Sequence, residues 1–111
     1  MSDNDQSSDN NLASTVNVKI VSLCGRFSDD HKRVRVEFEL TDADRKPTVE
    51  LSLIDSAGVV ITHAVIMGVL VRQMYFTLHL GKHPSDKPVW VKILLRTDDH
   101  LCLDEKTEPV E

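Results

Sequence analysis

The chain has 111 residues, of which 41% are hydrophobic and 28% are charged, and its formal net charge is −5. This length suits one domain, and the share of large apolar residues excludes a chain that stays disordered throughout. Fourteen valines stand against four alanines, and β-branched side chains favour strands over helices. The composition therefore indicates an all-β domain.

The negative charge lies at the two ends of the chain. Residues 1–14 and 104–111 each carry a net charge of −3, whereas residues 15–103 hold twelve bases and eleven acids. Such a mixed body gives no electrostatic basis for binding nucleic acid or an anionic membrane. No apolar run reaches the roughly 18 residues of a membrane span, and residues 1–11 lack the basic and apolar regions of a signal peptide. We therefore expect a cytoplasmic protein with no nucleic-acid and no membrane partner.

Seven short apolar runs, separated by turn signals, predict seven strands. Along the first run the alternation slips at Val21 and Leu23, which indicates a bulge or a switch of the strand between sheets. The clearest run is Arg33 to Leu40, where apolar and charged residues alternate. Gly58 marks a hairpin turn after Asp55, because such turns need a positive φ. The expected strands are residues 16–23, 33–40, 48–54, 59–67, 73–80, 89–95 and 101–103.

The hairpin Val49 to Gly58 and the late strand Val89 to Leu95 resemble those of an immunoglobulin-like or fibronectin-III-like domain. The resemblance covers about residues 15–106 and implies a seven-stranded antiparallel two-sheet β-sandwich. A jelly roll or a small barrel is the structural alternative. Residues 1–14 form a disordered acidic tail in this prediction, and residues 107–111 form a flexible one.

The sequence carries few of the residues that catalysis needs. It has no Gly-x-Ser-x-Gly motif and no glycine-rich phosphate loop, and its five histidines are scattered. In a seven-stranded sandwich the first and last strands run parallel, and Cys24 ends the first while Cys102 begins the last. The two cysteines therefore lie near opposite ends, which predicts two free thiols. We therefore expect no enzymatic activity and no cofactor.

Acidic residues in two predicted loops suggest a metal site. Calcium takes six to eight oxygen ligands, and the sandwich order brings these two loops to the same end of the domain. The simpler interpretation is that aspartates in turns bond their own backbone and are solvated. The candidate ligands are Asp42, Asp44, Asp98, Asp99 and His100.

The segment Val59 to Val71 is apolar on both faces, although a strand of a two-sheet domain needs only one apolar face. Either residues 69–71 cover the second face or another chain does. An interface would use Val60, Ala64, Ile66, Val69 and Leu70. Our first hypothesis is therefore a non-catalytic β-sandwich interaction module that contacts an unknown protein or a second copy. The alternative is a calcium- or ligand-binding sandwich that uses the acidic loop residues.

The alternation in residues 33–40 also predicts the core. Its apolar side chains should meet Trp90, or Val91 and Ile93, from the opposite sheet. A shift of one residue would instead bury three charged side chains without partners. The predicted core residues of this strand are Val34, Val36, Phe38 and Leu40.

Overall fold

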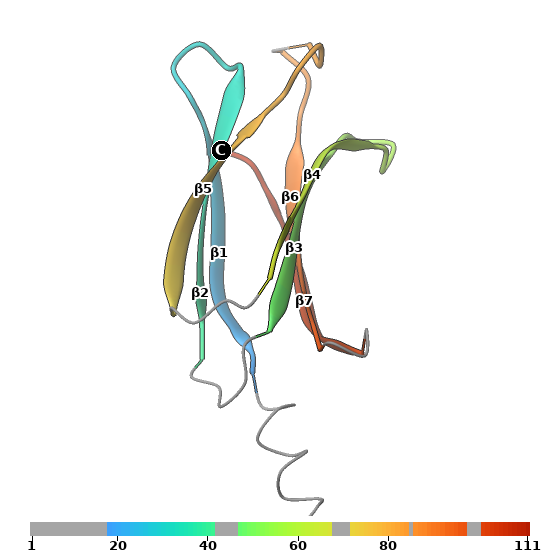
Figure 1. Ribbon diagram of the computed structural model, residues 1–111. Coiled ribbons are helices and arrows are strands. Elements are labelled where there is room, and N and C mark those ends of the chain that lie inside the picture. Colours follow the sequence, from blue (N-terminus) through green and yellow to red (C-terminus); the bar gives the residue numbers. More distant parts are fainter. Residues whose placement is uncertain (1–17, 42–46, 68–71, 85, 98–100) are drawn as a thin grey trace, which may run out of the picture.

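The computed structural model describes residues 18–41, 47–67, 72–84, 86–97 and 101–111, and these form seven strands. They pair antiparallel in two sheets, a three-stranded one of order β1-β2-β5 and a four-stranded one of order β4-β3-β6-β7. The sheets form two facing layers (Figure 1). The predicted all-β, seven-stranded antiparallel sandwich is confirmed. The strands are β1 (Ile20–Phe27), β2 (Arg33–Leu40), β3 (Thr48–Ile54), β4 (Val60–Ile66), β5 (Gln73–His79), β6 (Trp90–Arg96) and β7 (Cys102–Pro109).

The core lies between the sheets and follows the alternation of the strands. In β2 the four predicted residues, Val34, Val36, Phe38 and Leu40, are at most 2% exposed. The Phe38 ring stacks on that of Phe76 in β5, with 6.4 Å between the centroids. Both sheets therefore contribute fully buried side chains to one core. From the four-stranded sheet these are Val49, Leu51, Leu53, Val91, Ile93 and Leu95.

Val91 and Ile93 lie in this core as predicted, whereas Trp90 does not. Strand β6 alternates between buried and half-buried residues, and Trp90 falls on the half-buried side with Lys92 and Leu94. Because successive side chains point to opposite faces of a sheet, Trp90 lies on the outer face. Of the two predicted alternatives for packing against β2 from the opposite sheet, Val91 and Ile93 are therefore correct and Trp90 is not.

Two predicted irregularities are present. The register of β1 shifts between Ile20 and Ser22 while β1 stays paired with β2, so of the two alternatives at Val21 the bulge is present and the sheet switch is not. After β3, the Asp55 carboxylate accepts hydrogen bonds from the backbone N–H groups of Ala57 and Val59, each at 2.9 Å. Gly58 supplies the positive φ of this turn, at 82°.

The sandwich extends further toward the C-terminus than expected. Strand β7 pairs with β6 as far as Pro109, and the Glu111 N–H donates to the Gly25 carbonyl at 2.9 Å. The expected domain boundary at residue 106 is therefore too early, because backbone pairing holds this segment although its sequence is charged. The predicted tail at residues 1–14 lies outside the described residues.

The C-terminal residues also close one corner between the sheets. The Val110 N–H donates to the Val89 carbonyl, and the Phe27 N–H donates to the Glu111 carbonyl. Gly25 makes room for this closure, since a Cβ there would lie 3.2 Å from Val110 Cγ2 and 3.1 Å from Val91 Cγ1. The glycine therefore allows β1 to approach the end of the chain.

Candidate functional site

The outer face of the four-stranded sheet carries a network of three polar side chains around Glu50. Glu50 lies at the middle of β3, and its register neighbours on the outer face are Val65 in β4 and Leu94 in β6. His63 is opposite Ser52 and Arg96 is opposite Thr48, so each stands diagonally to Glu50 on a neighbouring strand. Long side chains reach each other across such diagonals. Three strands therefore bring together residues that are far apart in the sequence.

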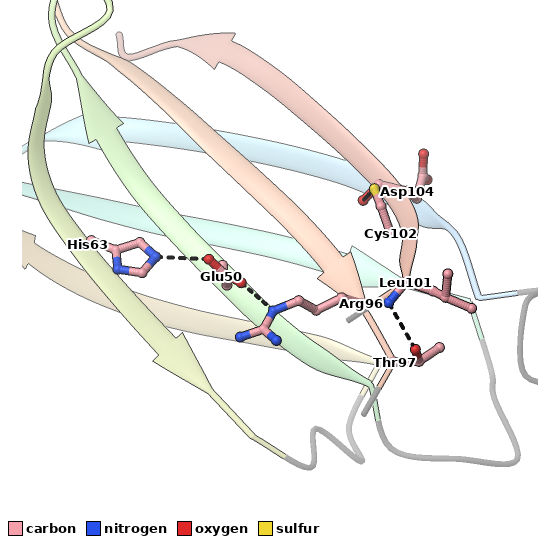
Figure 2. Close-up of polar contacts among 7 residues, drawn as sticks. All are labelled: Glu50, His63, Arg96, Thr97, Leu101, Cys102 and Asp104. Carbon is pink, nitrogen blue, oxygen red and sulfur yellow. Dashed lines mark hydrogen bonds and ion pairs between the residues drawn. The ribbon is translucent and has the colours of Figure 1, made fainter. Parts of the chain in front are cut away.

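Each oxygen of the Glu50 carboxylate has its own partner (Figure 2). Oε1 lies 3.0 Å from His63 Nε2, and Oε2 accepts a hydrogen bond from Arg96 Nε–H. The Glu50 and Arg96 side chains are 22% and 20% exposed, so both are largely shielded from water. The hydrogen bond from His63, followed by that from Arg96, lowers the pKa of Glu50 below its usual value, although partial burial opposes the shift. The network holds Glu50 as a carboxylate.

The β6–β7 hairpin lies beside this network (Figure 2). The Leu101 N–H donates to Thr97 Oγ1 at 3.2 Å, and the Thr97 N–H donates to the Leu101 carbonyl at 3.0 Å. Asp104 Oδ2 accepts from the Ile20 N–H at 2.9 Å, which ties β7 to the start of β1. These bonds have a structural role, since they fix the hairpin and one corner of the sandwich.

An apolar row crosses all four strands at the other end of the outer face. Register places Val60 opposite Ile54, Ile54 opposite Trp90, and Trp90 opposite Pro109. Val60 is 56% exposed, and Ile54 and Trp90 are half-buried. The next row toward the centre is polar throughout. It consists of His63, Ser52, Lys92 and Thr107.

The predicted interface residues do not share one face. Ala64 and Ile66 point inward and pack against the core, whereas Val60 pairs with Ile54 on the outer face. The cause is a register shift in which Ile61 is the extra residue, so the alternation reverses within β4. Val69 and Leu70 lie outside the described residues. The expectation that Val60 belongs to the same face as Ala64 and Ile66 is therefore wrong.

The metal prediction stays untested at its named positions, because Asp42, Asp44, Asp98, Asp99 and His100 all lie outside the described residues. Within the described ranges, no group of three or more His, Cys, Asp or Glu side chains could hold a metal ion. In the β1–β2 turn, Asp30 accepts a hydrogen bond from Ser28 Oγ at 2.6 Å and another from the Lys32 N–H at 3.1 Å. Asp30 therefore behaves as a turn-capping aspartate.

Both cysteines are free, as predicted. Cys24 is half-buried in β1 and Cys102 is exposed at the start of β7. The Cys102 thiol makes one long contact, at 3.8 Å, with the Asp104 carbonyl. In the part of the chain that the structure describes, no helix is long and apolar enough to cross a membrane.

The fold is similar to part of a β-glucuronidase chain. No protein-family model matches the sequence, and no curated protein matches it. Among solved structures, β-glucuronidase from Ruminococcus gnavus in complex with D-glucaro 1,5-lactone matches with a TM-score of 0.54 at 12% identity, over 84% of this chain. Lactobacillus rhamnosus β-glucuronidase matches with a TM-score of 0.53 at 18% identity, also over 84%. This chain corresponds to only 15% of either enzyme chain, and at such identities the likeness shows the fold alone.

This finding contradicts our functional hypothesis from the sequence. We expected a non-catalytic interaction module that acts through protein contact or self-association, or alternatively a calcium- or ligand-binding sandwich. The matching solved structures named above are instead β-glucuronidases, which are glycoside hydrolases. The similarity to β-glucuronidases could not be predicted from the sequence. It lies in the arrangement of the strands, because the identity is only 12% and 18% in the two matches.

Proposed function

We propose that the chain works in the hydrolysis of β-glucuronides or related β-glycosides, as the β-sandwich part of a glycoside hydrolase. The observation that carries the proposal is the match to β-glucuronidases over 84% of this chain. Because the match spans only 15% of those chains, the rest of such an enzyme would lie outside the region that this sandwich resembles.

We further propose that the reaction centre lies in that other part. Most glycosidases need two carboxyl groups, one of which has a raised pKa and donates a proton to the leaving group. Glu50 has the opposite property, because His63 and Arg96 lower its pKa. Glu105, on the same row as Glu50 beyond Leu94, lies 3.4 Å from the Lys92 ammonium. Both carboxylates are thus engaged with cations, which supports a structural role in this domain.

We also propose that the sandwich is of the fibronectin-III-like type. In the constant-type immunoglobulin arrangement the fourth strand joins the sheet of the first two strands. Here β4 pairs with β3 in the other sheet, which supports a fibronectin-III-like variant of the immunoglobulin-like fold. The two free thiols support the cytoplasmic location that we expect from the sequence.

The test is to isolate the tagged chain from its native cells under mild conditions and to assay the eluate with p-nitrophenyl β-D-glucuronide. We expect the eluate to hydrolyse this substrate, and the purified recombinant chain alone to leave it intact. An eluate without glycosidase activity, against untagged cells as the control, would contradict the proposal. Hydrolysis by the recombinant chain alone would place the reaction centre in this domain, and Glu50→Gln would then show whether Glu50 takes part.

A further inference from the structure

Trp90, the first residue of β6, is a large aromatic residue on the outer face of the four-stranded sheet. It is the only tryptophan of the chain, and it lies on the outer face while its neighbours Val91 and Ile93 are completely buried. Ile54 and Pro109 flank it in register on β3 and β7. The indole is half-buried, and in the described part of the chain no third sheet packs on this outer face, so the remaining apolar surface of the ring faces outward.

The polar row beside Trp90 makes this surface amphipathic. Lys92 follows Trp90 by two residues on the same face of β6, between Ser52 of β3 and Thr107 of β7. Two residues along a strand span about 6.6 Å, which is the scale of one sugar ring. An apolar row and a row of hydroxyl and ammonium donors therefore lie side by side at that spacing.

Lys92 gives the surface a charge preference. Its ammonium lies 3.4 Å from a Glu105 carboxylate oxygen, and the two side chains are 44% and 54% exposed. An ion pair so open to water contributes little, so a second carboxylate can compete for the ammonium at small cost. The group that complements this row is thus an anion attached to a hydroxyl-rich molecule with one apolar face.

We propose that the two rows form a binding surface for uronic-acid glycosides. The C–H face of a β-linked pyranose would stack on Trp90, its hydroxyls would bond Ser52 and Thr107, and its carboxylate would pair with Lys92. This inference rests on the proposed function and names the class of sugar that this domain would hold. His63, at the β4 end of the polar row, also belongs to the Glu50 network, and the other two members of that network, Glu50 and Arg96, lie further along the sheet.

The experiment titrates the full chain with methyl β-D-glucuronide and, in parallel, with its neutral match methyl β-D-glucoside. Because Trp90 is the only tryptophan, its fluorescence reports on this surface alone, and backbone amide shifts in an NMR spectrum locate the contact. We expect shifts in the two rows, with the glucuronide bound about two- to fivefold more tightly than the glucoside, as an exposed ion pair allows.

Three variants separate the contributions. Lys92→Gln should remove the preference for the glucuronide and keep the binding of both sugars. Trp90→Phe should weaken both sugars equally, and Tyr75→Phe on the opposite sheet should change neither. Thermal melting of each variant verifies that it is folded.

Several outcomes would overturn the inference. The absence of shifts at these rows at millimolar excess of sugar excludes the surface, and equal affinity for the two sugars excludes the role of Lys92. Either result leaves the isolation assay unaffected, so the proposed function can stand when this site fails. If the isolation assay fails while the glucuronide binds, the surface is a uronate site in a protein of another kind.

Discussion

The two sheets share one core but have different outer faces. On the three-stranded sheet the outer face is mainly polar, with Arg26 of β1 opposite Arg35 of β2, and with Arg35 and Glu37 of β2 opposite Thr77 and Tyr75 of β5. On the four-stranded sheet an apolar row that contains Trp90 lies at one end, a polar row follows it, and the third row mixes Val65 and Leu94 with Glu50 and Glu105. The inner faces are alike in that both contribute fully buried aliphatic or aromatic residues to the core, such as Val36 and Phe38 from one sheet and Leu51 and Ile93 from the other.

The difference shows which part of each strand pattern reflects folding and which part is available for function. Burial dictates the inner residues of both sheets, because a polar group there would lose its hydration without a partner. No such constraint acts on the outer faces, so apolar residues there need another explanation. The three-stranded sheet exposes Val21 and Tyr75 at separate positions, whereas the four-stranded sheet carries a continuous apolar row from Val60 to Pro109.

The largest effect should come from the shared core. Phe38→Ala should cost about 3–5 kcal/mol and Leu51→Ala about 2–5 kcal/mol, because each leaves a cavity in a region that is close-packed. Urea unfolding of the two variants measures these costs. If one of them costs less than about 1 kcal/mol, the two inner faces do not contribute equally to a single core.

Strands with a regular alternation of apolar and polar residues could be predicted from the sequence, and a strand without it could not. The bounds of β2 and β3 are as predicted, because their alternation is regular and turn residues bound each run. Strand β7 was mostly missed, since Asp104 to Glu108 has no apolar alternation and is held by pairing with β6. An edge strand of this kind is set by its neighbour, and its own side chains do not reveal it.

The candidate site was harder to predict than the fold. His63 lies 13 residues from Glu50 and Arg96 lies 46 residues from it, so only the register of three strands brings them together. The outward position of Glu50 in an alternating strand was visible in the sequence, but its partners were not. The bulge at Ile61 likewise left no clear sequence signal, and it moved Val60 to the outer face.

Gly25→Ala should have the next largest effect, at about 1–3 kcal/mol, because the added methyl group overpacks the corner between the sheets. The new Cβ would lie 3.2 Å from Val110 Cγ2 and 3.1 Å from Val91 Cγ1. Combining it with Val110→Ala removes one of these contacts, so the double variant should lose less than the sum of the two single ones. Strict additivity in urea unfolding would mean that Val110 does not pack on β1 in solution.

Stability at acidic pH should depend on Glu50. Its pKa is lowered in the folded state, so its contribution is full above the ordinary pKa and is lost as the pH falls through the lowered value. The free energy of unfolding of the wild type should therefore decline below about pH 4.5, the ordinary value for Glu50. Glu50→Gln should flatten that decline, as measured by urea unfolding at a series of pH values.

Asp30→Asn is the matched variant in the turn that joins β1 and β2 of the other sheet. The Ser28 hydroxyl, followed by the Lys32 backbone N–H, lowers the pKa of Asp30, so the sign of its effect is the same. Asp30 is more exposed than Glu50, with 49% against 22% of the side chain accessible. Solvent screening should therefore make its effect smaller. If Asp30→Asn changes the decline of the free energy of unfolding at acidic pH more than Glu50→Gln does, the Glu50 network is not the main source of that decline.

The smallest effect should be that of Arg35→Ala on the polar outer face. Arg35 is exposed and lies 4.7 Å above the Tyr75 ring, an interaction of about 0.5–1 kcal/mol at such sites. It also stands directly opposite Arg26 on β1, and like charges facing each other across strands are destabilising. These two terms oppose each other, so the net change should stay within about 0.5 kcal/mol.

The salt concentration distinguishes the two terms, because salt screens the repulsion between exposed charges. The variant should therefore be more destabilised, relative to wild type, in high salt than in low salt. A cost near that of Phe38→Ala would instead mean that Arg35 is buried and that the assigned faces of β2 are reversed.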